Sequence, residues 1–216
     1  MQRREFSIQL AGVGLGLAVA GKASAQGTPV EGTHYVKLST RAPVTLPTPD
    51  KKIEVVEFFS YGCPHCYSLE PLIEPWAKKL APDVSFRQVP VGFSVPYQVL
   101  QKTFYALEEM GQLPNMHRKV FAAIHQQGRR LNTESDVVAF MTASGVDAAK
   151  FTEAYRGFGV NTKCNRAKQL SEAYKIDGVP AVGIQGRYYT AASLAGTHER
   201  ALAVADFLIQ KSRQGG

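Results

Sequence analysis

Cys63 and Cys66 are separated by two residues and stand where an apolar, strand-like run changes to a helical pattern. Residues i and i+3 in the first turn of a helix lie about 5 to 6 Å apart. A disulfide requires a similar separation of its Cα atoms. The pair could therefore alternate between two thiols and one disulfide with little backbone movement, which predicts redox chemistry.

The position of Cys63 favours a thiolate. A helix begins at about this residue, and the first backbone N–H groups of a helix have no partners within it. These donors and the helix dipole stabilise a negative sulfur. Pro64 is suited to the first helical position, because its missing donor would be unpaired there anyway. His65 adds a positive charge or a hydrogen bond, so the residues between the cysteines are expected to tune the redox potential.

Two other interpretations of the pair are weaker. A structural zinc site needs about four ligands, yet the chain has one further cysteine, Cys164. The remaining histidines show no ligand spacing: His34, His117, His125 and His198. A purely structural disulfide would close a very small loop and stabilise little. We therefore predict a catalytic disulfide, with no metal site and no other cofactor.

The elements that must position the pair are a strand before it and a helix after it. Ile53–Phe59 has the composition of a buried strand, although Glu57 and a second glutamate interrupt it. The helical pattern behind the pair runs to about Leu80 and contains Pro71 and Pro75. A proline inside a helix costs about 3 kcal/mol or more, so we predict a kinked or broken helix.

The remaining elements divide into a block of helices and a second group of strands. Residues 84–91 read as a strand, with Pro90 marking an edge or an end. Turn and capping residues then separate helical patterns at 99–110, 114–128, 133–144, 148–156 and 161–174. A hairpin follows, with strands at 179–184 and 187–190, and a closing helix runs from about 197 to 211.

This order favours an α/β sheet with an all-helical domain inserted in its middle over a continuous βα repeat. We place the sheet domain at residues 26–91 and 176–216 and the inserted helical domain at residues 92–175. The length of 216 residues suits one such unit.

Residues 1–25 are predicted to be a cleaved signal peptide. Arg3 and Arg4 form a basic start, a short apolar stretch follows, and Ala23-Ser24-Ala25 is a cleavage signal. The apolar stretch is too short to favour a retained membrane anchor. Arg3 and Arg4 also suit a twin-arginine signal, so that route and the general secretory route both stay open. Either route implies the envelope of a bacterial cell.

The charge of the chain argues against a nucleic-acid partner. The formal net charge is +7, and it falls to +5 when the leader, with three basic residues and one acidic residue, is removed. No run of Lys and Arg remains that would form a nucleic-acid footprint.

The segment Phe58–Cys66, which contains Cys-Pro-His-Cys, resembles the active site of the DsbA-type thiol:disulfide interchange proteins. Gly178-Val179-Pro180 and the helical insertion resemble that family too. The resemblance implies a thioredoxin-like fold and the donation of a disulfide to newly exported, unfolded proteins in the periplasm. It also implies reoxidation by a quinone-linked membrane partner of the DsbB type. We expect a monomer that is not embedded in the membrane.

The resemblance also assigns roles to residues. It implies that Cys63 is the exposed nucleophile, that Cys66 is its buried partner, and that Val179-Pro180 is a cis-proline loop facing the disulfide. Val179 would offer its backbone to an extended client chain.

Glu57 and Cys164 leave alternatives open. Glu57 could be an edge-strand residue facing water, or it could match the family's buried acid, which affects proton movement at Cys66 and has a raised pKa. The family often pairs that acid with a lysine, but only Arg87 or Gln88 stands near the matching position. Cys164, on a half-apolar helical face, is expected to be a buried, inert thiol.

The same residues are compatible with two other functions. An isomerase or reductase would use the same chemistry, although we expect no room for a dimerisation domain before the catalytic fold. A helical binding or chaperone module would use the pair only as a staple.

Overall fold

The structure is a computed structural model, and it describes residues 27–215. The predicted signal peptide and its twin arginines lie outside the described residues. Within residues 27–215, no helix has the length and apolar character needed to cross a membrane.

A five-stranded sheet forms the centre of the fold, in the order β1-β5-β4-β2-β3. Strand β2 pairs in parallel with β3 and antiparallel with β4. All seven residues of β2 are buried, while β3 lies at the edge and ends at Pro90, as predicted. The strands are β1 (Val36–Lys37), β2 (Ile53–Phe59), β3 (Val84–Pro90), β4 (Ala181–Ile184) and β5 (Tyr188–Thr190).

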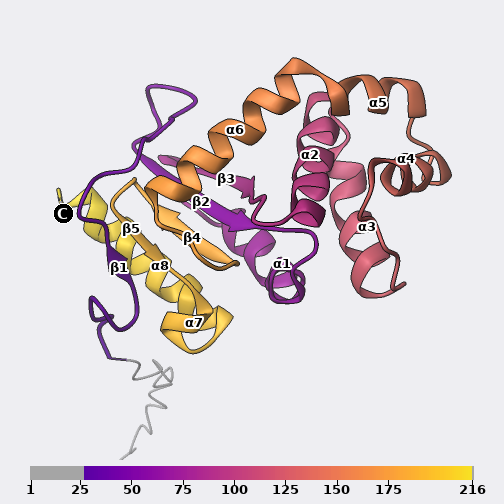
Figure 1. The fold of residues 1–216 in the computed structure, drawn as a ribbon. Helices are drawn as coiled ribbons and strands as arrows, with labels where there is room; N and C mark the ends of the chain where they lie inside the picture. The colour runs from indigo at the N-terminus through magenta and orange to yellow at the C-terminus, as the bar shows by residue number, and fades with distance from the viewer. Residues whose placement is uncertain (1–26, 216) are drawn as a thin grey trace, which may run out of the picture.

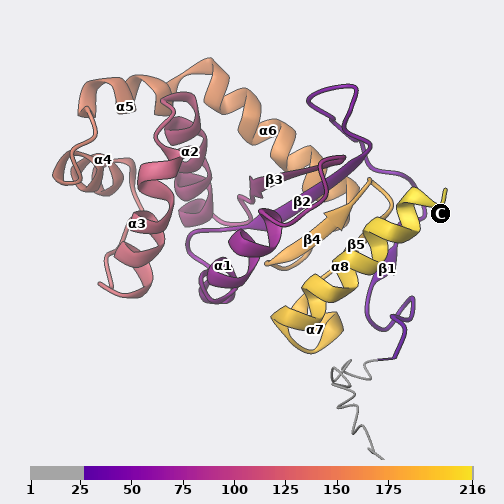
Figure 2. The same cartoon turned by 180° about the vertical axis from the view of Figure 1, so that it is seen from behind.

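Helices cover both faces of the sheet. Figures 1 and 2 show α1 and α8 on one face and α6 crossing the other, with α2 to α5 gathered beyond one end. Five helices, α2 to α6, lie between β3 and β4, which is the predicted helical insertion. The helices are α1 (Pro64–Ala77), α2 (Val95–Glu109), α3 (Leu113–His125), α4 (Glu134–Ala143), α5 (Ala148–Arg156), α6 (Phe158–Ala173), α7 (Ala192–Ala195) and α8 (His198–Arg213).

Helix ends follow the capping residues where the chain has them. The side chains of Thr133, Asp147 and Thr197 each accept a hydrogen bond from the first turn of α4, α5 and α8. The predicted bounds of α5 are confirmed. Helix α2 begins four residues before its predicted start, and α6 begins three residues before its own. Neither N-cap side chain bonds the first turn of its helix. The short α7 was not predicted.

We predicted a kinked or broken helix, and α1 is continuous through Pro71 and Pro75, so the alternative of a break is wrong. Both prolines lie on the exposed side of α1. On the opposite side Leu69 and Ile73 are buried against the sheet, and this packing holds the helix together.

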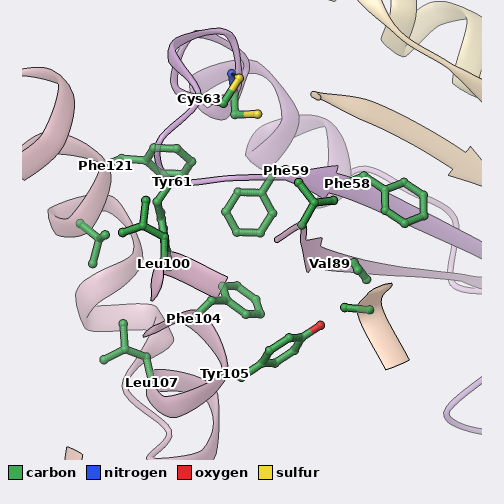
Figure 3. Packing of buried hydrophobic residues seen from close by; sticks show 14 of the residues in the cluster. Phe58, Phe59, Tyr61, Cys63, Val89, Leu100, Phe104, Tyr105, Leu107 and Phe121 are labelled. Atoms are coloured by element: carbon green, nitrogen blue, oxygen red, sulfur yellow. Dashed lines mark hydrogen bonds between the residues drawn. The ribbon is translucent and has the colours of Figure 1, made fainter. Parts of the chain in front are cut away.

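Two apolar clusters fill the molecule, one on each side of the sheet. The smaller joins the sheet to α1 and α8. The larger contains both cysteines of the pair and extends from β2 and β3 into the helical insertion. Figure 3 shows Cys63 beside Phe59 and Tyr61, with Phe104 and Phe121 contributed by the inserted helices. The insertion therefore packs directly behind the cysteines. The exact bounds of the two domains stay a prediction.

Candidate redox site

Cys63 is the N-cap residue of α1, with extended backbone angles (φ −90°, ψ 118°). Its sulfur accepts a hydrogen bond from the backbone N–H of Cys66 at 3.4 Å. Pro64 occupies the first turn of the helix, where its missing N–H has no consequence. The predicted arrangement of a sulfur at a helix N-terminus is therefore present.

The Val179-Pro180 loop lies opposite the pair. The peptide bond between these residues is cis, as the resemblance implies. The Cys63 thiol donates a hydrogen bond to the carbonyl oxygen of Val179 at 3.3 Å, across 116 positions of sequence. Val179 is half-buried and Pro180 is buried. A cavity of about 740 Å³ borders this loop and includes His65 in its lining.

The two cysteines differ in access. Cys66 is 0% exposed and Cys63 is 5% exposed, and no disulfide joins them in this structure. Cys63 is thus less exposed than the resemblance implies, because the Val179 loop and the helical insertion close around it. His65 and Pro64 are exposed. Of the two sulfurs, only that of Cys63 retains access to a second molecule.

The two sulfurs also differ in acidity. A hydrogen bond from the Cys66 side chain is the largest influence that lowers the pKa of Cys63 to about 6. Backbone N–H groups and the charge of His65 act in the same direction, and burial opposes them. Burial, followed by the interaction with Cys63, raises the pKa of Cys66. At neutral pH the pair therefore carries one thiolate, at Cys63, and one proton, at Cys66.

Glu57 is buried in β2, an interior strand of the sheet, so its water-facing interpretation is wrong. Burial, together with the charge of Glu70, raises the pKa of Glu57 to about 8. The carboxylate accepts a hydrogen bond from Gln88 Nε2 at 2.8 Å, and Gln88 is its register partner on β3. Arg87 instead bonds Glu54, at 3.0 Å. Glu57 in turn contributes to the raised pKa of Cys66.

Three further residues, joined to one another and to Gln88 by the contacts of His117, were not predicted as site residues: Glu70, His117 and Tyr61. Glu70 is four positions after Cys66 in α1, so helical spacing could have placed it on the same face. His117 comes from the helical insertion, and no spacing in the sequence points to it.

Cys164 lies apart from the pair, in the helical insertion. It is half-buried on α6, and burial raises its pKa to about 11 even though Lys102 has the opposite influence. Residues 27–215 contain no cluster of His, Cys, Asp and Glu side chains that could hold a metal ion.

Comparisons with known proteins match this geometry to one family. Residues 54–202 match the family described as DSBA-like thioredoxin domain. The chain is 44% identical over 182 residues to a "Thiol:disulfide interchange protein DsbA" of Azotobacter vinelandii, covering 84% of each chain. It is 40% identical to the protein of that name in Bordetella pertussis, covering 99% of this chain and 100% of the relative.

Solved structures are similar as well. The crystal structure of Pseudomonas aeruginosa DsbA has a TM-score of 0.80 and 41% identity, covering 85% of this chain and 94% of that one. The oxidoreductase DsbA from Xylella fastidiosa has a TM-score of 0.78 and 28% identity, covering 86% and 98%.

Proposed function

The chain belongs to the family of DsbA-like thioredoxin domains and is a thiol:disulfide oxidoreductase, and we propose that it donates the Cys63–Cys66 disulfide to newly exported proteins in the periplasm. The observation that carries the proposal is the contrast between the two sulfurs. The lowered pKa of Cys63 and the raised pKa of Cys66 suit a leaving thiolate and a protonated partner. Because a stabilised thiolate favours the reduced pair, the disulfide is oxidising.

The reaction proceeds through a mixed disulfide. A client thiolate attacks Cys63 of the oxidised pair, the bond between the cysteines breaks, and Cys66 leaves with the electron pair and takes up a proton. A second client thiolate then attacks the client sulfur of the mixed disulfide, and Cys63 leaves as a thiolate. The client gains one disulfide, and the protein is reduced by two electrons.

Glu57 supplies the proton for Cys66. A carboxyl group whose pKa is about 8 still holds its proton at neutral pH, and the charge of the ionised form acts on Cys66. When the Cys66 thiolate forms in a buried site, the proton passes from Glu57 to it. Reoxidation reverses this transfer.

Val179 and the cavity beside it hold the client. The client chain lies extended along the Val179 backbone, as a strand added to an edge does. His65, exposed at the rim of the cavity, contacts the client sulfur during exchange and stabilises negative charge there. Pro180 fixes the loop against the pair.

A quinone-linked membrane oxidase of the DsbB type returns the pair to the disulfide. The redox-active disulfide is the only cofactor, and the protein works as a monomer without nucleic acid and without being embedded in the membrane. Both export routes remain compatible with this role.

Two measurements test the proposal. Cys63→Ser, expressed in a strain that lacks its periplasmic dithiol oxidase, should fail to restore disulfide formation. Restoration by that variant would leave only a stapling role for the pair. The equilibrium of the native protein with glutathione should lie far toward oxidised glutathione and reduced protein, whereas a strongly reducing pair would favour the isomerase or reductase alternative.

A further inference from the structure

A chain of polar contacts leads from the buried acid to the inserted helices. Gln88 donates to Glu57 Oε2 at 2.8 Å, and its Nε2 lies 3.4 Å from His117 Nε2. The same imidazole nitrogen is 3.1 Å from Glu70 Oε1. The other nitrogen of His117, Nδ1, is 2.8 Å from the Tyr61 hydroxyl. His117, on α3, therefore contacts Gln88 of β3, Glu70 of α1 and Tyr61, which follows β2.

Apart from His117, no basic side chain among the described residues forms an ion pair with Glu57 or Glu70. Glu57 and Glu70 are 1% and 8% exposed, and each has one buried oxygen without a hydrogen-bond partner among the described residues. The charge of Glu70 contributes to the raised pKa of Glu57. Two buried carboxylates near one another repel, so one must keep a proton or a cation must lie between them.

His117 is the basic side chain placed to act as that cation. Arg118 is next to His117 in the sequence and Arg87 is next to Gln88, but Arg118 pairs with the half-buried Glu74 and Arg87 pairs with Glu54. The remaining titratable group against His117 is the Tyr61 hydroxyl. Among the residues that the structure describes, His117 alone combines a basic side chain with a contact to Glu70.

The His117 ring packs against aromatic side chains on one side and a small cavity on another. Its centroid is 5.2 Å from that of Tyr61 and 5.3 Å from that of Phe121. A small cavity of about 240 Å³, lined by His117, Gln88 and Glu70, leads to the exposed Arg118. The His117 side chain is 13% exposed, so protons from water can reach it.

We propose that His117 is a positioning residue of the redox reaction, whose imidazolium balances Glu57 and Glu70 and so sets how readily Glu57 gives its proton to Cys66. This rests on the proposed role of Glu57. When Glu57 passes its proton to the Cys66 thiolate, the new carboxylate is balanced by a proton that His117 has taken from water through the small cavity. On reoxidation Cys66 returns its proton to Glu57, and His117 releases one to water.

The test is the titration of Glu57 in the reduced protein, followed by the infrared C=O band of its protonated carboxyl group and assigned by the loss of that band in Glu57→Gln. In His117→Gln the titration midpoint of Glu57 should rise by about one pH unit, a tenfold change in proton affinity. The reason is that the cation has been removed while the negative charge of Glu70 remains. In Glu70→Gln the midpoint should fall, because a like charge has been removed. His117→Lys, which restores a cation, should return it to the native value or below.

His125→Gln is the matched control. His125 lies on the same helix and also contacts Tyr61, through the backbone oxygen at 2.8 Å, but it bonds neither carboxyl group. Its replacement should leave the Glu57 midpoint unchanged.

An unchanged midpoint in folded His117→Gln would overturn the proposal. If that variant fails to fold, His117→Lys provides the test by itself. A Glu57 midpoint in His117→Lys above that of the native protein would count against an imidazolium at this position. The titration needs no client, so it can fail independently of the proposed function. Conversely, an undiminished rate of client oxidation in Glu57→Gln would reject the role of Glu57 without changing the titration of the native protein.

Discussion

Cys63 and Cys66 carry the same side chain three residues apart, yet their surroundings drive their acidity in opposite directions. Cys63 stands at the end of a helix, where donors converge on its sulfur. Cys66 is one turn inside that helix, fully buried and close to Glu57. Each pKa unit of difference is worth about 1.4 kcal/mol, so the helix end at Cys63 and the burial of Cys66 together separate the two roles.

Replacing Cys66 should disturb the Cys63 thiolate more than replacing His65. The hydrogen bond from Cys66 is the largest influence that lowers the pKa of Cys63, and the charge of His65 is the smallest of those named. Thiolate absorbance against pH should have a midpoint near 6 in the native protein. We expect an upward shift of about one unit or more in Cys66→Ala and a smaller one in His65→Ala. The reverse order would show that the charge of His65 dominates.

Glu57 should make the folded protein less stable as pH rises. Its pKa is raised from 4.5 to about 8 in the fold, so between these values the folded state holds a proton that the unfolded state has lost. The stabilisation is complete below pH 4.5 and is lost as the pH rises toward 8. Urea unfolding across pH should show this loss, on the order of a few kcal/mol, in native protein relative to Glu57→Gln.

The quantity to follow is the difference in free energy of unfolding between the native protein and Glu57→Gln at each pH. In the reduced state the lowered pKa of Cys63 adds stability as pH rises from about 6 to 9, which opposes the effect of Glu57, and the subtraction removes this contribution. A difference that does not change with pH would mean that Glu57 ionises in the fold as it does in water.

Local spacing was enough to predict the pair, the proline between them and the helix behind them. It was not enough to predict the partners of Glu57. Gln88 meets Glu57 through the register of two strands, and His117, on a distant helix, contacts Gln88 and not Glu57 itself. Neither contact joins residues at a regular helical or strand spacing, so a single sequence does not indicate them.

At the scale of the elements, β4 packs closely against Tyr174, the residue that ends α6. Gly183 lies against the ring of Tyr174, where an added Cβ would be 2.5 Å from the ring atom Cε1. Tyr174 has little freedom to move, because it is buried, packs edge-on against Phe58 and accepts a hydrogen bond from the Gly186 N–H at 2.8 Å. The strand next to the cis-proline loop is thus positioned by a helix of the insertion.

Gly183→Ala should therefore destabilise the protein by about 1–3 kcal/mol, the usual cost of overpacking. The measurement is the urea midpoint of the reduced protein. Gly178→Ala is the control, because an added Cβ there has no neighbour within 4 Å. Equal stability of the two variants would mean that Tyr174 can move aside.

The elements themselves were largely predictable, and the exceptions have physical causes. Thr133 and Asp147 carry capping side chains, and the starts of α4 and α5 were predicted from them. Helices α2 and α6 lack such a bond at their N-caps, so their starts were placed too late. The helix α1 is not broken at Pro71 and Pro75, because the packing of Leu69 and Ile73 against the sheet holds it together.

At the scale of the whole molecule, the larger apolar cluster is shared between the sheet and the helical insertion. Neither part can separate without exposing side chains of the other. We therefore expect a single unfolding transition in spite of the insertion.

The one tryptophan permits a direct test of this cooperativity. Trp76 lies on α1 and packs against the smaller cluster, on the other face of the sheet, while Met141 is buried in α4 of the insertion. Met141→Ala should cost about 2–5 kcal/mol and should shift the Trp76 fluorescence transition by as much as the far-ultraviolet circular dichroism transition. A fluorescence transition that stays in place would show that the insertion unfolds by itself.

The position of His117 on α3 also limits how such chains can be recombined. A chimera that kept this sheet and took α2 to α6 from another protein would retain Cys63, Cys66 and Glu57, but it would inherit whatever side chain the donor places against Glu70. Its active-site motif would be unchanged, but the set of groups that bind protons around Glu57 would differ. Cys-Pro-His-Cys is therefore not sufficient to transfer the chemistry to another protein. The transferred segment would also have to include the face of α3 that carries His117, some fifty residues after the motif.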